Sequence, residues 1–141
     1  MHEHFDQNFD NNLEEIAFPV VQDLEKEKNS EKDEKSALIS ELSIKGYQKL
    51  KANSLNEARE FFEKILELDT DNNYALVGLG DTERKQENFQ EAIKFYSRCL
   101  EFHPDNNYAL FGLADCYKAL RQFTKAIEIW EKYLLFPGSI S

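Results

Sequence analysis

The sequence has few cysteines and no long apolar run, and these absences exclude several classes of protein. Its two cysteines, Cys99 and Cys116, lack a CxxC motif or any other spacing typical of metal ligands. We predict reduced thiols packed between helices, with a disulfide between them as the alternative. No stretch approaches the roughly 18 apolar residues of a membrane span, and no basic start with an apolar signal-peptide segment follows Met1. The expected location is the cytoplasm, with no membrane span.

Basic residues are also scarce, because 17 Lys and Arg face 27 Asp and Glu, which gives a formal net charge of -10. Residues 1–36 contain 11 acids and 4 bases, a net charge of -7, and residues 37–141 contain 16 acids and 13 bases, a net charge of -3. Binding to a nucleic acid duplex requires several Lys or Arg side chains placed against phosphates. We therefore expect no nucleic acid partner.

Motifs of common catalytic and cofactor sites are missing as well. The sequence has no GxxxxGK phosphate loop, no GxSxG, no HExxH and no GxGxxG after a strand. His103 precedes Pro104 in a predicted turn, where neither a general base nor a metal site has partners in sequence. His2 and His4 are interpreted as solvated side chains near the start of the chain. We expect no enzyme, no cofactor and no metal site.

What the sequence does contain is a repeat. The stretch NNYALVGLGD at residues 72–81 returns as NNYALFGLAD at residues 106–115, an offset of 34 residues. The same offset aligns further residues, namely Phe89 with Phe123, Ala92 with Ala126, Ile93 with Ile127 and Leu100 with Leu134. A fixed offset of this size indicates a repeat array, with units at residues 39–72, 73–106 and 107–140.

Each unit is predicted to form two helices joined by a short turn. Apolar residues recur on one face, as Leu38, Leu42, Gly46 and Leu50 do in the first helix. Four helices are expected at about residues 37–51, 55–68, 73–86 and 89–102, and two more in the third unit. The fifth is expected to bury Leu110, Leu113, Ala114 and Tyr117, and the sixth Ala126, Ile127, Trp130, Tyr133 and Leu134. Capping boxes are expected from the spacing of Ser54 with Glu57 and of Asn88 with Glu91. Gly80 and Ala92 are expected to be small because the two helices of one unit approach there.

Residues 1–36 are acidic and contain few apolar side chains, so they are predicted to be a disordered tail. One apolar island, LEEIAFPVVQDL from Leu13 to Leu24, interrupts this composition, and Pro19 disfavours a helix there. It is interpreted as part of the tail, with docking into the groove of the same chain or recognition by another protein as alternatives. The repeats are placed at residues 37–136, followed by a short end at 137–141.

The repeat length and the spacing of small and large residues resemble the tetratricopeptide repeat family. The second and third units carry its pattern at Leu76, Leu79, Gly80, Ala92, Tyr96 and Pro104, and at Leu110, Leu113, Ala114, Tyr117, Ala126 and Trp130. Polar Lys45, Lys49 and Glu83 depart from it at positions that are usually apolar. The resemblance implies an all-α fold, a right-handed α-solenoid of three helix-turn-helix repeats with a disordered N-terminal tail.

In this family the first helices of the repeats line a concave groove, and the resemblance implies which residues face it here. They are Ser40, Ser43, Tyr47, Tyr74, Val77, Asp81, Lys85, Tyr108, Phe111, Asp115 and Lys118. Aromatic anchors carry much of the binding energy at such surfaces, and Asp81 with Asp115 favours a basic group on the ligand. The alternative is that Tyr74 and Tyr108 only pack the helix starts.

The resemblance implies a non-enzymatic protein-protein interaction module. One well-known subgroup grips the terminal carboxylate of chaperone partners with Lys, Asn and Arg, but those positions carry Ser43, Tyr47, Gly78, Tyr108 and Gly112 here. That clamp is therefore absent. We predict a scaffold or adaptor that binds a peptide segment with apolar anchors and a Lys or Arg. The alternative is a small chaperone for secreted proteins of the three-repeat type.

The last predicted helix has an apolar face without a neighbour. Ile127, Leu134, Leu135 and Phe136 are followed by no further helix in the sequence. Because terminal repeats need a polar outer face, an apolar one indicates an interface. Three explanations are open: the chain is part of a longer array, it self-associates through this helix, or a partner covers the face.

Overall fold

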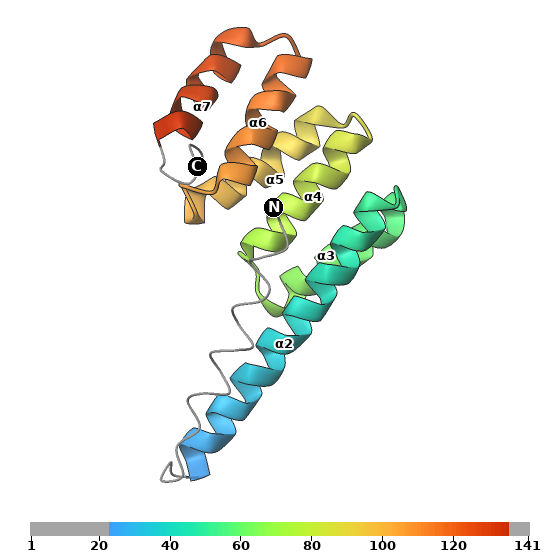
Figure 1. Cartoon of the computed structure of the whole chain (residues 1–141), viewed down its shortest axis with the longest axis vertical. Helices are drawn as coiled ribbons and strands as arrows, with labels where there is room; N and C mark the ends of the chain where they lie inside the picture. The colour runs from blue at the N-terminus through green and yellow to red at the C-terminus, as the bar shows by residue number, and fades with distance from the viewer. Residues whose placement is uncertain (1–22, 136–141) are drawn as a thin grey trace.

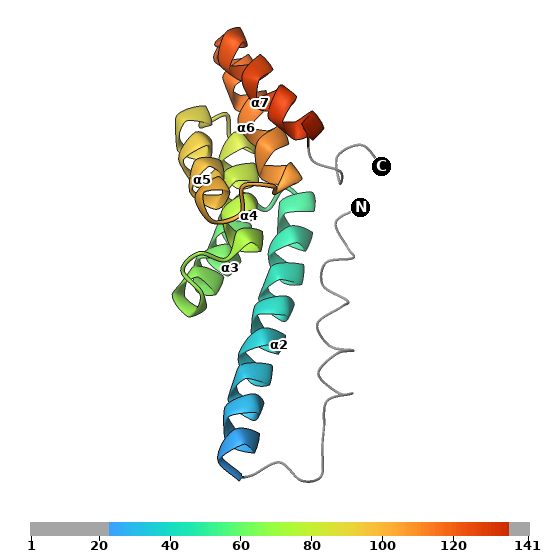
Figure 2. The ribbon, with the colours of Figure 1, turned by 90° about the vertical axis from the view of Figure 1, so that its left-hand side faces the viewer.

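The computed structural model describes residues 23–135, which form six α-helices and no strand (Figure 1). In chain order they are α2 (Asp23–Lys51), α3 (Leu55–Leu68), α4 (Asn73–Lys85), α5 (Phe89–Phe102), α6 (Asn107–Ala119) and α7 (Phe123–Leu135). The helices form three hairpins, α2 with α3, α4 with α5 and α6 with α7, and the hairpins stack in sequence order (Figures 1 and 2). The predicted all-α repeat solenoid is confirmed.

Helix α2 is longer than the first predicted helix, because it begins at Asp23 rather than near Ala37. The prediction of a disordered tail over residues 1–36 therefore wrongly included the first residues of this helix. Glu and Lys dominate the added helical segment, and both are good helix formers. A composition poor in apolar residues thus suits a solvent-exposed helix as well as a disordered tail. Residues 1–22, with most of the apolar island, and residues 136–141 lie outside the described part of the chain.

The turn inside each hairpin has one residue in the left-handed region, Asn53, Glu87 or Arg121. In the first hairpin the N–H of Ser54 donates to Lys49 O at 2.8 Å, closing the helix as a Schellman motif does. The predicted capping boxes are wrong, since neither Ser54 nor Asn88 caps its helix with its side chain. Their ψ angles of 75° and 69° lie outside the extended backbone that brings a capping side chain to the helix start.

Asparagine side chains cap the helices that begin each new hairpin. Asn72 has an extended backbone, and its Oδ1 accepts a hydrogen bond from the N–H of Ala75 at 3.0 Å. Asn106 does the same with Ala109 at 2.9 Å. These caps fix the first turns of α4 and α6, which the repeated NNYAL stretch encodes.

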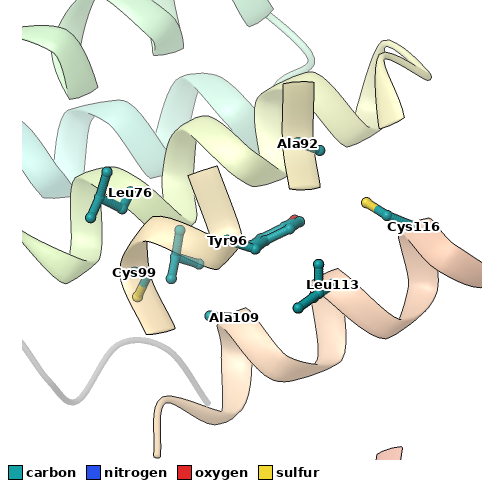
Figure 3. Close-up of a cluster of buried hydrophobic side chains, with 8 residues drawn as sticks. Leu76, Ala92, Tyr96, Cys99, Ala109, Leu113 and Cys116 are labelled. Atoms are coloured by element: carbon teal, nitrogen blue, oxygen red, sulfur yellow. The ribbon is translucent and has the colours of Figure 1, made fainter. Parts of the chain in front are cut away.

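Two buried rings pack between successive hairpins where glycine leaves space. The Tyr96 ring of α5 is fully buried, and a Cβ on Gly80 or Gly112 would lie 2.6 or 2.3 Å from it. Figure 3 shows Tyr96 among Leu76, Ala92 and Leu113. Phe62 of α3 has the equivalent role one hairpin earlier, against Gly46 and Gly78. The glycines of the repeat are therefore required by ring packing on both sides, within a hairpin and between hairpins.

Both cysteines lie in the core. Cys99 and Cys116 are free thiols with no exposed surface, and Figure 3 shows them on α5 and α6. Burial raises the pKa of each thiol to about 12. The prediction of reduced thiols packed between helices is confirmed.

The two ends of the stack differ in polarity. On α7, Ile127 and Leu134 are 52% and 61% exposed, whereas their counterparts on α5, Ile93 and Leu100, are partly buried against the core. The outer face of α2 instead carries an exposed ion pair, Lys45 Nζ to Glu41 Oε2 at 2.9 Å, beside Gln48 and the partly exposed Ile44. The apolar face predicted for the last helix is thus present on α7, while the outer face of α2 is mixed and carries charges.

Within residues 23–135, no helix combines the length and the apolarity required to cross a membrane.

Candidate functional site

The first helices of the three hairpins surround a hollow of about 250 Å³, which we call the central hollow. Its lining residues come from α2, α4 and α6 and the turn before α6, and they are Tyr47, Asn73, Tyr74, Val77, Asp81, Asn106, Asn107 and Tyr108. Five of the eleven predicted groove residues, Tyr47, Tyr74, Val77, Asp81 and Tyr108, are among them. The structure therefore brings together the aromatic part of the predicted set.

The tyrosines of the central hollow are held by the fold. The Tyr47 hydroxyl donates a hydrogen bond to Tyr74 O at 2.8 Å. The Tyr47 ring also meets Phe62 edge-on, with centroids 4.9 Å apart. Tyr74 and Tyr108 occupy the second positions of α4 and α6, two residues after the asparagine caps. The Tyr47 ring is therefore positioned before a ligand binds, which reduces the entropy cost of binding.

One polar group of the central hollow was not predicted from the sequence. Asn107 Oδ1 is buried and accepts no hydrogen bond within the described residues. A buried acceptor without a partner costs about 1–3 kcal/mol. The sequence did contain a signal, because Asn73 and Asn107 repeat at the same offset, but both were interpreted only as parts of helix starts.

The two predicted groove acids share a cation of the chain itself. Arg84 Nη1 lies 2.9 Å from Asp115 Oδ2, and Arg84 Nη2 lies 3.3 Å from Asp81 Oδ1. The Tyr96 hydroxyl donates to Asp81 and accepts from Arg84 Nε at 3.0 Å. Burial, with the neighbouring Asp81 carboxylate, raises the pKa of this hydroxyl, so it stays protonated and acts as a donor to Asp81. Arg84 was not predicted from the sequence, because its ion pair with Asp115 joins two different repeats.

The remaining predicted groove residues lie away from the central hollow. Lys85 lines a neighbouring hollow of about 350 Å³ together with Arg84 and Asp115, and its Nζ lies 3.4 Å from Leu50 O. Phe111 is 48% exposed, and its ring centroid is 6.4 Å from that of Tyr133. Lys118 is exposed and lines neither hollow. Ser43 is fully buried and Ser40 lies beside Glu41 on another face of α2, so the prediction that these two face the groove is wrong.

His103, which was excluded as a catalytic candidate, makes a structural contact. His103 Nε2 lies 3.3 Å from Asp71 O, in the turn between the first and second hairpins. The ring therefore helps to join α5 to the preceding turn.

Two family models described as tetratricopeptide repeat match the chain, one over residues 45–107 and the other over residues 83–135. Together they span residues 45–135, which include the C-terminal end of α2 and all later helices. Among curated proteins, none matches the chain in sequence.

Solved structures of similar fold include three informative examples. The TPR domain of Arabidopsis FLU is 26% identical with a TM-score of 0.64, over 72% of this chain and 95% of that one. The second TPR of Spaghetti (RPAP3), bound to the HSP90 peptide SRMEEVD, is 18% identical with a TM-score of 0.68, over 75% and 97%. MamA is 22% identical with a TM-score of 0.65, over 84% and 77%. The last two show a shared fold alone.

Proposed function

The chain belongs to the tetratricopeptide repeat family, and we propose that it is a non-enzymatic scaffold or adaptor that holds a peptide segment of a partner protein. The observation that carries this proposal is the central hollow, which tyrosines from three helices line together with Asn73, Val77, Asp81, Asn106 and Asn107. Its volume suits one large apolar side chain of an extended segment. The Spaghetti structure, which holds a peptide on a similar fold, supports this mode of action.

Apolar anchors, rather than a basic group, are proposed as the main feature of the ligand. Asp81 and Asp115 together carry two negative charges, but Arg84 already lies between them. These three side chains together carry a net charge of about -1, and Lys85 lies beside them. A Lys or Arg on the ligand would therefore add selectivity at the rim, while the aromatic contacts supply most of the affinity.

Replacing Tyr74 and Tyr108 together with alanine is expected to weaken peptide binding at least 30-fold, about 2 kcal/mol, because two rings of the hollow are lost. Peptides would first be selected from a random twelve-residue phage library on the full chain. Their affinity for the wild type and the variant would then be measured by fluorescence anisotropy.

The matched control replaces both residues with phenylalanine, which keeps the rings and should retain most of the affinity. Far-ultraviolet circular dichroism would show that all variants keep their helices. Selected peptides that bind the double alanine variant as tightly as the wild type would contradict the assignment of the hollow.

A second surface supports association between copies. We propose that the apolar face of α7 packs against α7 of a second copy, because the outer face of α2 carries the Glu41 and Lys45 charges beside Ile44 and is less complementary to it. Replacing Ile127 and Leu134 with lysine is therefore expected to abolish dimers in sedimentation equilibrium. The control replaces Glu41 and Lys45 with alanine at the other end, which should leave the association unchanged.

A wild-type chain that is monomeric at all concentrations would contradict this interface. A dimer that survives the lysine substitutions but is lost when residues 1–22 are removed would instead favour the alternative predicted from the sequence, the small chaperone of secreted proteins.

A further inference from the structure

We propose that, without a partner, the central hollow is occupied by the first twelve residues of the same chain, with Phe5 or Phe9 inserted as the anchor. This inference rests on the proposed function, since it names an internal competitor for the same hollow. It makes peptide binding a displacement reaction, in which a partner segment must replace the N-terminal one.

Chain length decides which part of the N-terminal segment reaches the hollow. The first half of α2 projects beyond the stacked hairpins (Figures 1 and 2). Asp23 precedes Tyr47 by 24 residues in one helix, which corresponds to about 36 Å at 1.5 Å per residue. The preceding chain must return along this distance before it can meet the tyrosines.

An extended chain spans at most about 3.6 Å per residue, so about ten residues before Asp23 are used in covering 36 Å. Ile16, which is 7 residues before Asp23, reaches only about 25 Å. The apolar core of the Leu13–Leu24 island therefore falls short of the hollow. Phe9 and Phe5, which lie 14 and 18 residues before Asp23, reach about 50 and 65 Å and have chain to spare.

The composition of residues 1–12, MHEHFDQNFDNN, supplies an anchor for the hollow. Phe5 and Phe9 are its only Phe, Tyr or Trp residues, and the hollow of about 250 Å³ accommodates one aromatic side chain among Tyr47, Tyr74 and Tyr108. One inserted phenylalanine would therefore fill the space.

Because the N-terminal segment belongs to the same chain, even a weak contact is sufficient for it to occupy the hollow. A flexible connection gives an effective concentration on the order of 1 mM. A segment with an intrinsic Kd of about 0.1 mM would then fill about nine-tenths of the hollows and reduce the apparent affinity for an added peptide about tenfold.

The test uses a fluorescein-labelled synthetic peptide of residues 1–12 and the full-length chain. The variant Phe5→Ala with Phe9→Ala is expected to bind this peptide about tenfold more tightly than the wild type, because its own segment no longer competes. Adding Tyr108→Ala to that variant should remove the binding. The control Phe18→Ala, in the island that cannot reach the hollow, should behave as the wild type.

Three outcomes would overturn the inference: no binding of the peptide to the double phenylalanine variant, equal binding to the variant and the wild type, or binding that survives Tyr108→Ala. Thermal unfolding of each variant would show that the fold is retained. Library peptides that still bind through Tyr74 and Tyr108 in any of these cases would leave the proposed function standing and remove only the internal competitor.

Discussion

Replacing Tyr96 with alanine is expected to lower the free energy of unfolding by about 3–5 kcal/mol, a large part of the 5–15 kcal/mol typical of a domain. The ring is fully buried between α4 and α6, where Gly80 and Gly112 leave no side chain to refill the space. Its loss also leaves Asp81 without the hydroxyl donor. Urea unfolding followed by circular dichroism at 222 nm would measure the change.

The matched variant Tyr96→Phe separates the ring from the hydroxyl. It keeps the packing and loses only the hydrogen bonds to Asp81 and Arg84, so a smaller loss of about 1–2 kcal/mol is expected. If the alanine and phenylalanine variants were equally stable, ring packing between the hairpins would not be the main contribution of Tyr96.

Replacing Gly112 with leucine is expected to destabilise the chain by about 3 kcal/mol, at the upper end of overpacking effects. Even a Cβ at this position would lie 2.3 Å from Tyr96 Cζ, and the hydroxyl of that ring is held by Asp81 and Arg84. The gain in helix propensity from replacing glycine, about 1 kcal/mol, does not compensate. Differential scanning calorimetry should show a lower Tm.

Combining Gly112→Leu with Tyr96→Ala tests the cause directly. The leucine then has the space that the ring occupied, so the double variant should be more stable than the sum of the two single effects predicts. Strict additivity would show that the leucine clashes with some other part of the structure.

The repeat alone predicted most of the fold, because core contacts recur at the same offset. The bounds expected at 55–68 and 89–102 are those of α3 and α5. The start of α2 was placed wrongly because α2 begins outside the repeat, where no second copy of the sequence indicates the helix. The periodic part of the chain was therefore predictable to within a residue or two, and the non-periodic part was not.

The polar departures from the family pattern could not be interpreted without coordinates. Glu83 replaces an aromatic residue, and the structure pairs it with Arg59 of the preceding helix at 3.2 Å. Lys49 lies 3.3 Å from Glu57, and Lys45 faces outward beside Glu41. Each departure is thus satisfied locally by a residue outside the pattern, and such pairs differ from one repeat to the next.

The central hollow was only partly predictable for the same reason. Tyr47, Tyr74 and Tyr108 follow from repeat position, so the sequence located them. Arg84 has Lys118 as its counterpart in the third repeat, and only Arg84 bridges Asp81 and Asp115. The ion pairs that set the charge beside the hollow therefore depend on individual residues, which a repeat pattern does not specify.

The difference between the outer faces of α2 and α7 limits how copies of this fold assemble. Head-to-tail stacking would place the Glu41 and Lys45 pair of one copy on the apolar side chains of another, and the desolvation of both charges would oppose it. Only such head-to-tail contacts can propagate into open filaments. The proposed contact between two α7 faces would bury both apolar surfaces at once, so growth would stop at a closed pair and the solenoid would be protected from polymerisation.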